Sequence, residues 1–256
     1  MMNPSFDSAR RRLLGAAFAG AGLGASSAFC AAERPRVALM AMGCIGEASA
    51  QSSEDIAGPA ISANAASGEV RVQATFQRDR FAGALSGLLP FVPWYHFLVW
   101  TEGRASHEAL FVTRASDVEL AAALKEIGAQ AGENLSLEAW EKRRDPGHPA
   151  PQTRIEGAPL AISILWKDAA QEIGIRDLLG DDAGRDFDFR FGGNLEHQKR
   201  WRSGCLVCLY SCPGSKVGNA AYTLRDYVTN QRRFALREKP SPPPGTMATI
   251  IFRRHK

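Results

Sequence analysis

Short runs in which apolar and polar residues alternate recur along this chain, and they constrain its fold more than any other feature. The alternation occupies residues 70–74, 160–166 and 187–191. Because successive side chains of a strand point to opposite faces of a sheet, each run predicts a strand with one buried face. Residues 93–101 and 106–113 are more continuously apolar, and the turn-like residues between them predict a β-hairpin.

Helical patterns are fewer and shorter. Ser116 followed by Glu119 has the spacing of a capping box, and apolar residues at helical spacing then continue to Gly128. Further short helices are expected within residues 135–143 and from Thr223 onward. The expected fold class is therefore α+β, a single mostly β domain with about two to four helices and a cysteine-bearing loop near the C-terminal third.

The N-terminus has the features of an export signal. Arg10, Arg11 and Arg12 precede two leucines and a Gly/Ala-rich run, and small residues end at Ala32. Such a segment predicts a cleaved signal peptide over residues 1–32, and the paired arginines favour the twin-arginine type over the general secretory type. We therefore expect a periplasmic protein.

After the signal, residues 33–68 read as a flexible lead-in rich in Ala, Ser and Gly, and residues 69–256 as one domain. No later run is long and apolar enough for a transmembrane span, although a lipid anchor at Cys44 is an alternative. The formal net charge is +4, and about half of it falls in the signal segment. This small excess, without a basic run interleaved with aromatic residues, argues against a nucleic-acid partner.

Three cysteines stand close together in the segment 203–214. Cys205, Cys208 and Cys212 have the spacing C-x2-C-x3-C, and Pro213 follows. This matches the last three cysteines and the proline of the bacterial iron–sulfur run, in which thiolates ligate the irons. The first cysteine of that run is replaced here by Arg202, so a fourth ligand must come from elsewhere. Cys44 is the candidate cysteine in the mature chain, and His197 is an alternative.

Other uses of these cysteines remain open. An exported protein meets an oxidising compartment, where Cys205, Cys208, Cys212 and Cys44 could instead form disulfides. Zinc is a third choice, although the spacing is unusual for a zinc site. A thiol–disulfide oxidoreductase working through Cys205 and Cys208 is a fourth, without the βαβ context that normally accompanies it.

Two sets of polar residues, one just before the cysteines and one after the expected hairpin turn, are candidates for further roles. Lys199, Arg200 and Arg202 directly precede the thiols and could tune a centre there or dock an acidic redox partner. His107 and Glu108 are adjacent, so on a strand they would diverge, and a structural pair is expected.

Several stretches together resemble the YdjY-like family of exported proteins. They are Phe191-Gly-Gly-Asn-Leu195, the segment 203–214, Gly218-Asn-Ala-Ala-Tyr-Thr223 and, upstream, Ser106 to Phe111. Members of this family are commonly described as ferredoxin-like, and the resemblance covers about residues 59–228. It implies export and a redox role without an established reaction.

The leading hypothesis is an electron-transfer or redox accessory protein. It would bind an iron–sulfur cluster of the 4Fe-4S type through Cys205, Cys208, Cys212 and Cys44 and serve a redox partner protein not identified by the sequence. The alternative is a disulfide-stapled periplasmic binding or structural module without a cofactor. No catalytic motif supports an enzyme.

Overall fold

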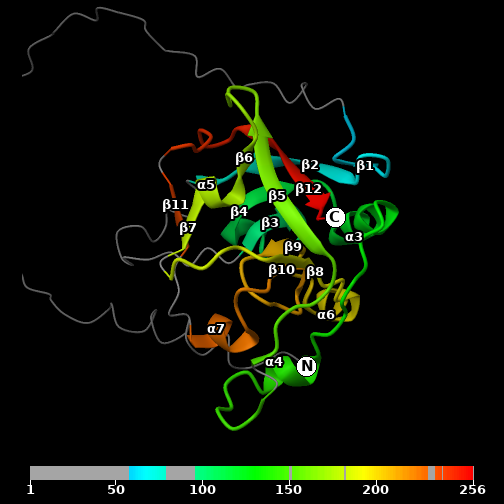
Figure 1. Ribbon diagram of the computed structural model, residues 1–256, viewed down its shortest axis with the longest axis vertical. Coiled ribbons are helices and arrows are strands. Elements are labelled where there is room, and N and C mark those ends of the chain that lie inside the picture. Colours follow the sequence, from blue (N-terminus) through cyan, green and yellow to red (C-terminus); the bar gives the residue numbers. More distant parts are fainter. Residues whose placement is uncertain are drawn as a thin grey trace, which may run out of the picture. The chain divides into compact units, whose positions relative to one another are not determined.

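The computed structural model describes residues 58–78, 96–149, 152–181, 183–229, 234–237 and 239–255 (Figure 1). All of them belong to one compact unit, Ser53–Lys256. The predicted signal segment and Cys44 lie outside the described residues. The first strand begins at Ile61, within the stretch 33–68 that the sequence suggested as a lead-in.

A closed barrel of eight strands forms the body of this unit. The strands follow one another in the order β2-β12-β5-β8-β10-β9-β3-β4, and β4 pairs again with β2 to close the circle. Two further strands, β1 and β6, pair with β2 and β5. The strands are β1 (Ile61–Asn64), β2 (Glu69–Phe76), β3 (His96–Trp100), β4 (Ala109–Thr113), β5 (Pro159–Trp166), β6 (Ile173–Gly174), β8 (Phe189–Phe191), β9 (Cys205–Cys208), β10 (Ser215–Asn219) and β12 (Met247–Arg254).

Short helices and a small second sheet complete the unit. The sheet pairs β7 (Leu179–Asp181) with β11 (Phe234–Leu236). Figure 1 shows α4 and α7 close together below the barrel, where Trp140 and Tyr227 contact each other at a ring-centroid distance of 5.2 Å. The helices are η1 (Ser106–Glu108), α3 (Asp117–Glu126), α4 (Leu137–Glu141), α5 (Ile175–Leu178), α6 (Leu195–Trp201) and α7 (Leu224–Thr229).

The closed barrel corrects the predicted α+β class. The α-helices of the described residues are mostly short, with α3 the longest at 10 residues, and they flank a sheet that closes on itself. Alternating side chains reveal that a strand has one buried face, but they carry no information on whether the first and last strands meet. The cysteine-bearing loop is also wrong in part, because Cys205 and Cys208 are the two ends of strand β9.

Several individual elements match their sequence patterns. In β2 and β5 the buried positions alternate with more accessible ones, as the alternation of side chains requires. The capping box of α3 is present, since the Ser116 hydroxyl accepts a hydrogen bond from the Glu119 N–H at 3.2 Å. These elements could be predicted because each of them depends on residues that are close together in the sequence.

The predicted hairpin between β3 and β4 is wrong, because the two strands run parallel. Residues 101–108, including η1, return the chain along β3 before β4 begins. The next parallel pair is similar: residues 209–214 join β9 to β10. Parallel neighbours usually need a connection of a dozen or more residues, so a short link is normally read as a hairpin. Two neighbouring pairs of barrel strands are therefore each joined by a short return connection.

The interior is filled by apolar side chains of the barrel strands. Phe111 lies between Phe76 and Phe97, with both ring centroids at 5.2 Å, and all three side chains are fully buried. None of the helices that the structure describes is long and apolar enough to cross a membrane.

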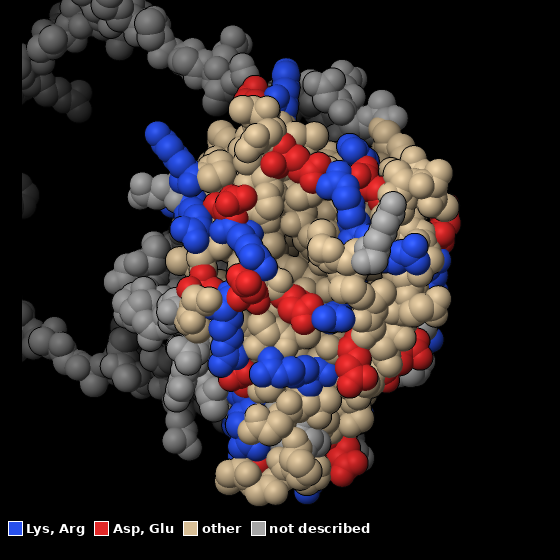
Figure 2. Space-filling view, in the orientation of Figure 1, with Lys and Arg blue, Asp and Glu red and all other residues tan. Residues whose placement is uncertain are grey.

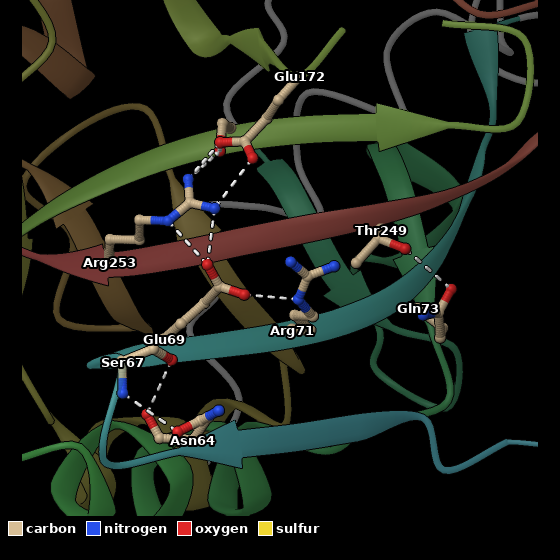
Figure 3. A network of polar contacts seen from close by, with 9 residues as sticks. Asn64, Ser67, Glu69, Arg71, Gln73, Glu172, Thr249 and Arg253 are labelled. Atoms are coloured by element: carbon tan, nitrogen blue, oxygen red, sulfur yellow. Dashed lines mark hydrogen bonds and ion pairs between the residues drawn. The ribbon is translucent and has the colours of Figure 1, made fainter.

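The outer surface of β2, β12 and β5 carries a network of ion pairs (Figure 3). Arg253 contacts Glu69 at 2.6 Å and also Glu172, while Glu69 binds Arg71 at 2.5 Å. On the face drawn in Figure 2, basic and acidic side chains are interspersed rather than gathered by sign. This face therefore carries no broad area of a single charge.

Candidate functional site

The return connection after β9 brings the three cysteines together. Cys205 and Cys208 end the strand, and residues 209–214 lead back beside it to Ser215, which pairs with Cys205 in the parallel ladder. Cys212 lies on this return. All three thiols are free and buried, with exposed fractions of 1% for Cys205, 0% for Cys208 and 7% for Cys212. The short crossover thus turns a linear spacing into a compact cluster.

Contacts between side chains define this cluster. The thiols of Cys205 and Cys212 lie near enough to the Cys208 thiol for each to shift its pKa. His96, from the neighbouring strand β3, places Nδ1 3.2 Å from Cys205 Sγ. The Gly214 N–H donates to Cys212 Sγ at 3.4 Å, and the Cys205 thiol donates to the Val207 carbonyl at the same distance. We call His96, Cys205, Cys208 and Cys212 the thiol cluster.

Burial and mutual interaction raise the pKa of two thiols of the cluster, Cys208 and Cys212. The hydrogen bond with Cys205 raises the pKa of Cys208 well above its ordinary value and burial raises it further, whereas the bond with Cys212 acts in the opposite direction. The hydrogen bond with Cys208 and burial likewise raise the pKa of Cys212. Burial lowers the pKa of His96, against the influence of Cys212 and Glu108. Because a nucleophilic cysteine needs a depressed pKa and access, this arrangement disfavours thiol–disulfide exchange as the function.

Polar contacts fix the start of β9. Gln198 of α6 donates to the carbonyls of Cys205, at 2.7 Å, and Gly214, at 3.2 Å. The Ser203 hydroxyl donates to the same Gly214 carbonyl at 2.8 Å. These bonds hold the beginning of the strand against the end of its return connection.

A close approach of two glycines positions the same strand from the other side. Gly204 has a φ of +67°, and a Cβ there would lie 2.5 Å from the Gly103 Cα. A Cβ on Gly103 would in turn lie 2.4 Å from the Ser203 carbonyl oxygen. Only glycine at both positions allows the connection after β3 to pack on the residues that lead into Cys205.

The structure separates the other predicted site residues. His197 forms its contacts with other residues than the cysteines. Its Nε2 is hydrogen-bonded to the Leu135 carbonyl at 3.0 Å, and its ring packs on Trp201. Cys44 lies outside the described residues. His107 and Glu108 form part of η1 rather than a strand, and their side chains are 3.3 Å apart on the surface.

His96 is the member of the thiol cluster that the sequence did not indicate. It lies at the start of an apolar strand, more than a hundred positions before the cysteines, and no spacing links it to them. The pairing of β3 with β9 places it opposite Cys208. Only knowledge of the strand order could have revealed this.

A cavity of about 410 Å³ lies at the residues that lead into β9. Arg104, Lys199 and Arg202 line it together with the acidic Glu102 and Asp117. Gln198 and Gly204 also line it, so the cavity is in contact with the residues that hold Cys205. Two of the three basic residues that the sequence singled out therefore border a hollow next to the cysteine strand.

The donor set of the thiol cluster is chemically suited to a soft metal centre. Three thiols and one imidazole are ligand types found in iron–sulfur and zinc sites. As the side chains are placed, however, no group of three or more His, Cys, Asp or Glu residues in the described part of the chain could hold a metal ion. Binding a metal would require the thiols to lose their protons and to rotate.

Comparisons with known proteins agree with the family resemblance of the sequence. A protein of Escherichia coli (strain K12), described as "Uncharacterized protein YdjY", is 34% identical over 162 residues. The alignment covers 62% of this chain and 66% of that protein. No solved structure matches the chain. The YdjY domain matches residues 61–253, which include the barrel strands except for the last residue of β12, and the chain therefore belongs to the YdjY domain family.

Proposed function

We propose that this protein is an exported electron-transfer or redox accessory protein that binds an iron–sulfur cluster through Cys205, Cys208 and Cys212. The observation that carries the proposal is the convergence of all three cysteine side chains in one buried cluster. A thiolate is unstable in such surroundings without a compensating cation, so a bound metal centre would stabilise the form that ligates it.

The surroundings of the thiol cluster suit a redox centre. Burial shields an iron–sulfur cluster from solvent, which is one of the factors that set its potential. The basic side chains of Arg104, Lys199 and Arg202 line the adjacent cavity. They offer positive charge to an acidic partner protein, which would favour rapid association. Export to the periplasm is supported by the arginine-rich, Gly/Ala-rich N-terminal segment.

Anaerobic purification tests this function. The folded protein is assayed for iron and acid-labile sulfide, and its visible absorption spectrum is recorded. We expect stoichiometric iron and sulfide in the wild type and their loss in Cys205→Ser, Cys208→Ser and Cys212→Ser. The Cys44→Ser variant shows whether that residue supplies a ligand. Colourless, iron-free wild-type protein, before and after reconstitution with ferrous iron and sulfide, would contradict the proposal.

A second candidate is a cofactor-free module stapled by a disulfide. It is favoured by the proximity of the thiols, since Cys205 and Cys212 both influence the pKa of Cys208, which could be oxidised with either of them. Thiols are counted in denaturant on protein isolated from an oxidising compartment, before and after reduction. Two additional thiols after reduction, in protein without iron, would support the stapled module over the redox centre.

A further inference from the structure

The cavity at the residues that lead into β9 has the features of a ligand site of its own. We propose that it binds a small organic dicarboxylate, held chiefly by Arg104 and Arg202. This inference does not depend on the iron–sulfur proposal, because the cavity can bind such a ligand whether or not the thiols hold a metal centre.

Backbone contacts place the two arginines next to each other. Arg202 is the C-cap of α6, and Arg104 lies in the connection after β3. The Arg104 N–H donates to the Arg202 carbonyl at 3.0 Å, and the close approach of Gly103 and Gly204 packs the same two segments together. Both arginines line the cavity. A guanidinium presents its donors in a fixed fork that matches a carboxylate, so two guanidinium groups suit a ligand with two carboxylates.

The backbone of Arg202 has a conformation that is unfavourable for arginine. Its φ of 54° and ψ of 31° lie in the left-handed region, which costs a residue with a Cβ about 1 kcal/mol. Helices that end in this conformation usually do so at a glycine. Residues held in such conformations cluster at functional sites. A binding role for the guanidinium accounts for an arginine at a position that favours glycine.

The balance of charge in the cavity favours an anion. The two arginines and Lys199 line it together with Glu102 and Asp117. The charge of Asp117 is compensated by Lys216, whose buried ammonium lies 3.3 Å from the carboxylate. Three cations are then opposed by Glu102 alone among the described residues that line the cavity, so a dianion would neutralise the surplus.

The size and the remaining lining favour an organic ligand over an inorganic ion. A volume of about 410 Å³ is within the range of small-molecule sites, about 300–1,000 Å³. Trp100 and Val118 also line the cavity and offer apolar surface to a carbon skeleton. Gln198, another lining residue, is 3% exposed, and its amide oxygen has no hydrogen-bond partner among the described residues. A ligand hydroxyl that donates to this oxygen would satisfy it.

Isothermal titration calorimetry tests the proposal on the exported protein as isolated, at low ionic strength and without phosphate in the buffer. Malate is the probe, because it carries two carboxylates and one hydroxyl. We expect it to bind at one site, and acetate, with a single carboxylate, to bind about tenfold more weakly or less. No binding of malate at millimolar concentrations would overturn the proposal. Inorganic phosphate that binds as tightly as malate would overturn the dicarboxylate class.

An exchange at Arg202 separates binding from a structural role. Arg202→Gly removes the guanidinium and relieves the left-handed backbone, so it should weaken malate binding about tenfold or more without lowering the free energy of unfolding. Arg104→Ala should weaken binding similarly. Arg200→Ala is the matched control, because it removes the same charge from a neighbouring residue that does not line the cavity, and it should change the affinity about twofold or less.

The same variants can contradict the assignment. Arg202→Gly that binds malate as the wild type does would overturn it. Equal losses of affinity in Arg202→Gly, Arg104→Ala and Arg200→Ala would also overturn it, because they would trace binding to net charge instead of the cavity. Iron enters none of these measurements, so their failure would leave the iron–sulfur proposal intact, and iron-free protein can still bind malate.

Discussion

Several glycines occupy positions where any side chain would collide with backbone. Gly157 has a φ of +119°, and a Cβ there would lie 2.0 Å from the Phe191 carbonyl oxygen. The same residue forms an isolated bridge with Ala131. Its lack of a side chain lets residues 131 and 132 pack beside the end of β8.

Replacing Gly157 by alanine should therefore destabilise the fold strongly. We expect a loss of about 3 kcal/mol, because both the positive φ and the collision must be relieved by backbone movement. Gly184→Ala is the control, since Gly184 also has a positive φ but no atom within 4 Å of the added Cβ, and about 1 kcal/mol is expected there. Chemical denaturation measures both variants, and equal losses would show that the contact with Phe191 is unimportant.

Lys216 is a charged residue buried beside the first turn of α3. The Lys216 side chain is fully buried, and its ammonium lies 3.3 Å from the Asp117 carboxylate at the start of α3. Burial lowers the pKa of Lys216, and Asp117 opposes this shift. Because the folded protein binds this proton less tightly than the unfolded chain, the lysine destabilises the fold below its folded pKa. The penalty is relieved as the pH rises towards the unfolded pKa.

Removing each partner of this pair should have opposite effects. Asp117→Asn leaves a buried ammonium without its counter-ion and should cost about 3 kcal/mol at pH 7. Lys216→Met removes the buried charge and leaves Asp117, which is 15% exposed and lies in the first turn of α3 where the helix dipole favours a carboxylate, so the change should be neutral or stabilising. Urea denaturation across pH 7 to 10 measures both, and the Asp117→Asn deficit should shrink as the pH rises. A deficit independent of pH would contradict the electrostatic origin.

At the level of elements, helix α3 depends on its first turn. Ser116 and Glu119 exchange hydrogen bonds that satisfy two N–H groups left free by the helix geometry. Ser116→Ala should lower the free energy of unfolding by about 1 kcal/mol. Val118→Ala, on the same turn with a 55% exposed side chain, should change it little. Thermal unfolding followed by circular dichroism compares the two, and equal shifts would show that the cap contributes nothing.

The sequence predicted elements that depend on local pattern and missed those that depend on distant pairing. The cap at Ser116 and strands β2 and β5 followed from neighbouring residues. The parallel course of β3 and β4 did not, because a short link is compatible with both directions. In the thiol cluster, the spacing identified the cysteines, whereas His96 required the β3–β9 pairing. Strand order is set by the whole core, so no single segment encodes it.

At the level of the whole molecule, ion pairs tie three barrel strands together on the outside (Figure 3). Arg253 of β12 links Glu69 of β2 to Glu172, which follows β5. The hydrogen bond from Arg253 lowers the pKa of Glu172, although burial acts against it. For Glu69, burial raises the pKa, but the bonds from Arg71 and Arg253 outweigh it and the net shift is downward. Both carboxylates therefore stabilise the fold when ionised.

This network predicts that the free energy of unfolding decreases as the pH falls into the acid range. A carboxylate with a lowered folded pKa stabilises the protein above its unfolded pKa, and the contribution is lost as the pH falls through the folded value. Glu172→Gln should be less stable than the wild type by about 1 kcal/mol or less at pH 7, since the pair is partly exposed. The difference should vanish near the folded pKa and below it. A difference that persists in acid would assign the effect to packing instead of charge.

Because the barrel closes around β9, the reactivity of the buried thiols can report how often this part of the barrel opens in the native state. A reagent such as iodoacetamide cannot reach sulfurs that are at most 7% exposed until β9 leaves its neighbours. In a variant with Cys30 and Cys44 replaced by serine, the alkylation rate in the metal-free protein should follow the opening equilibrium, and Gly157→Ala should accelerate it. Alkylation as fast as in an unfolded peptide would mean that β9 separates from its neighbouring strands at little cost in free energy. Slow alkylation would time the opening of the barrel in the native state, with no probe other than the cysteines themselves.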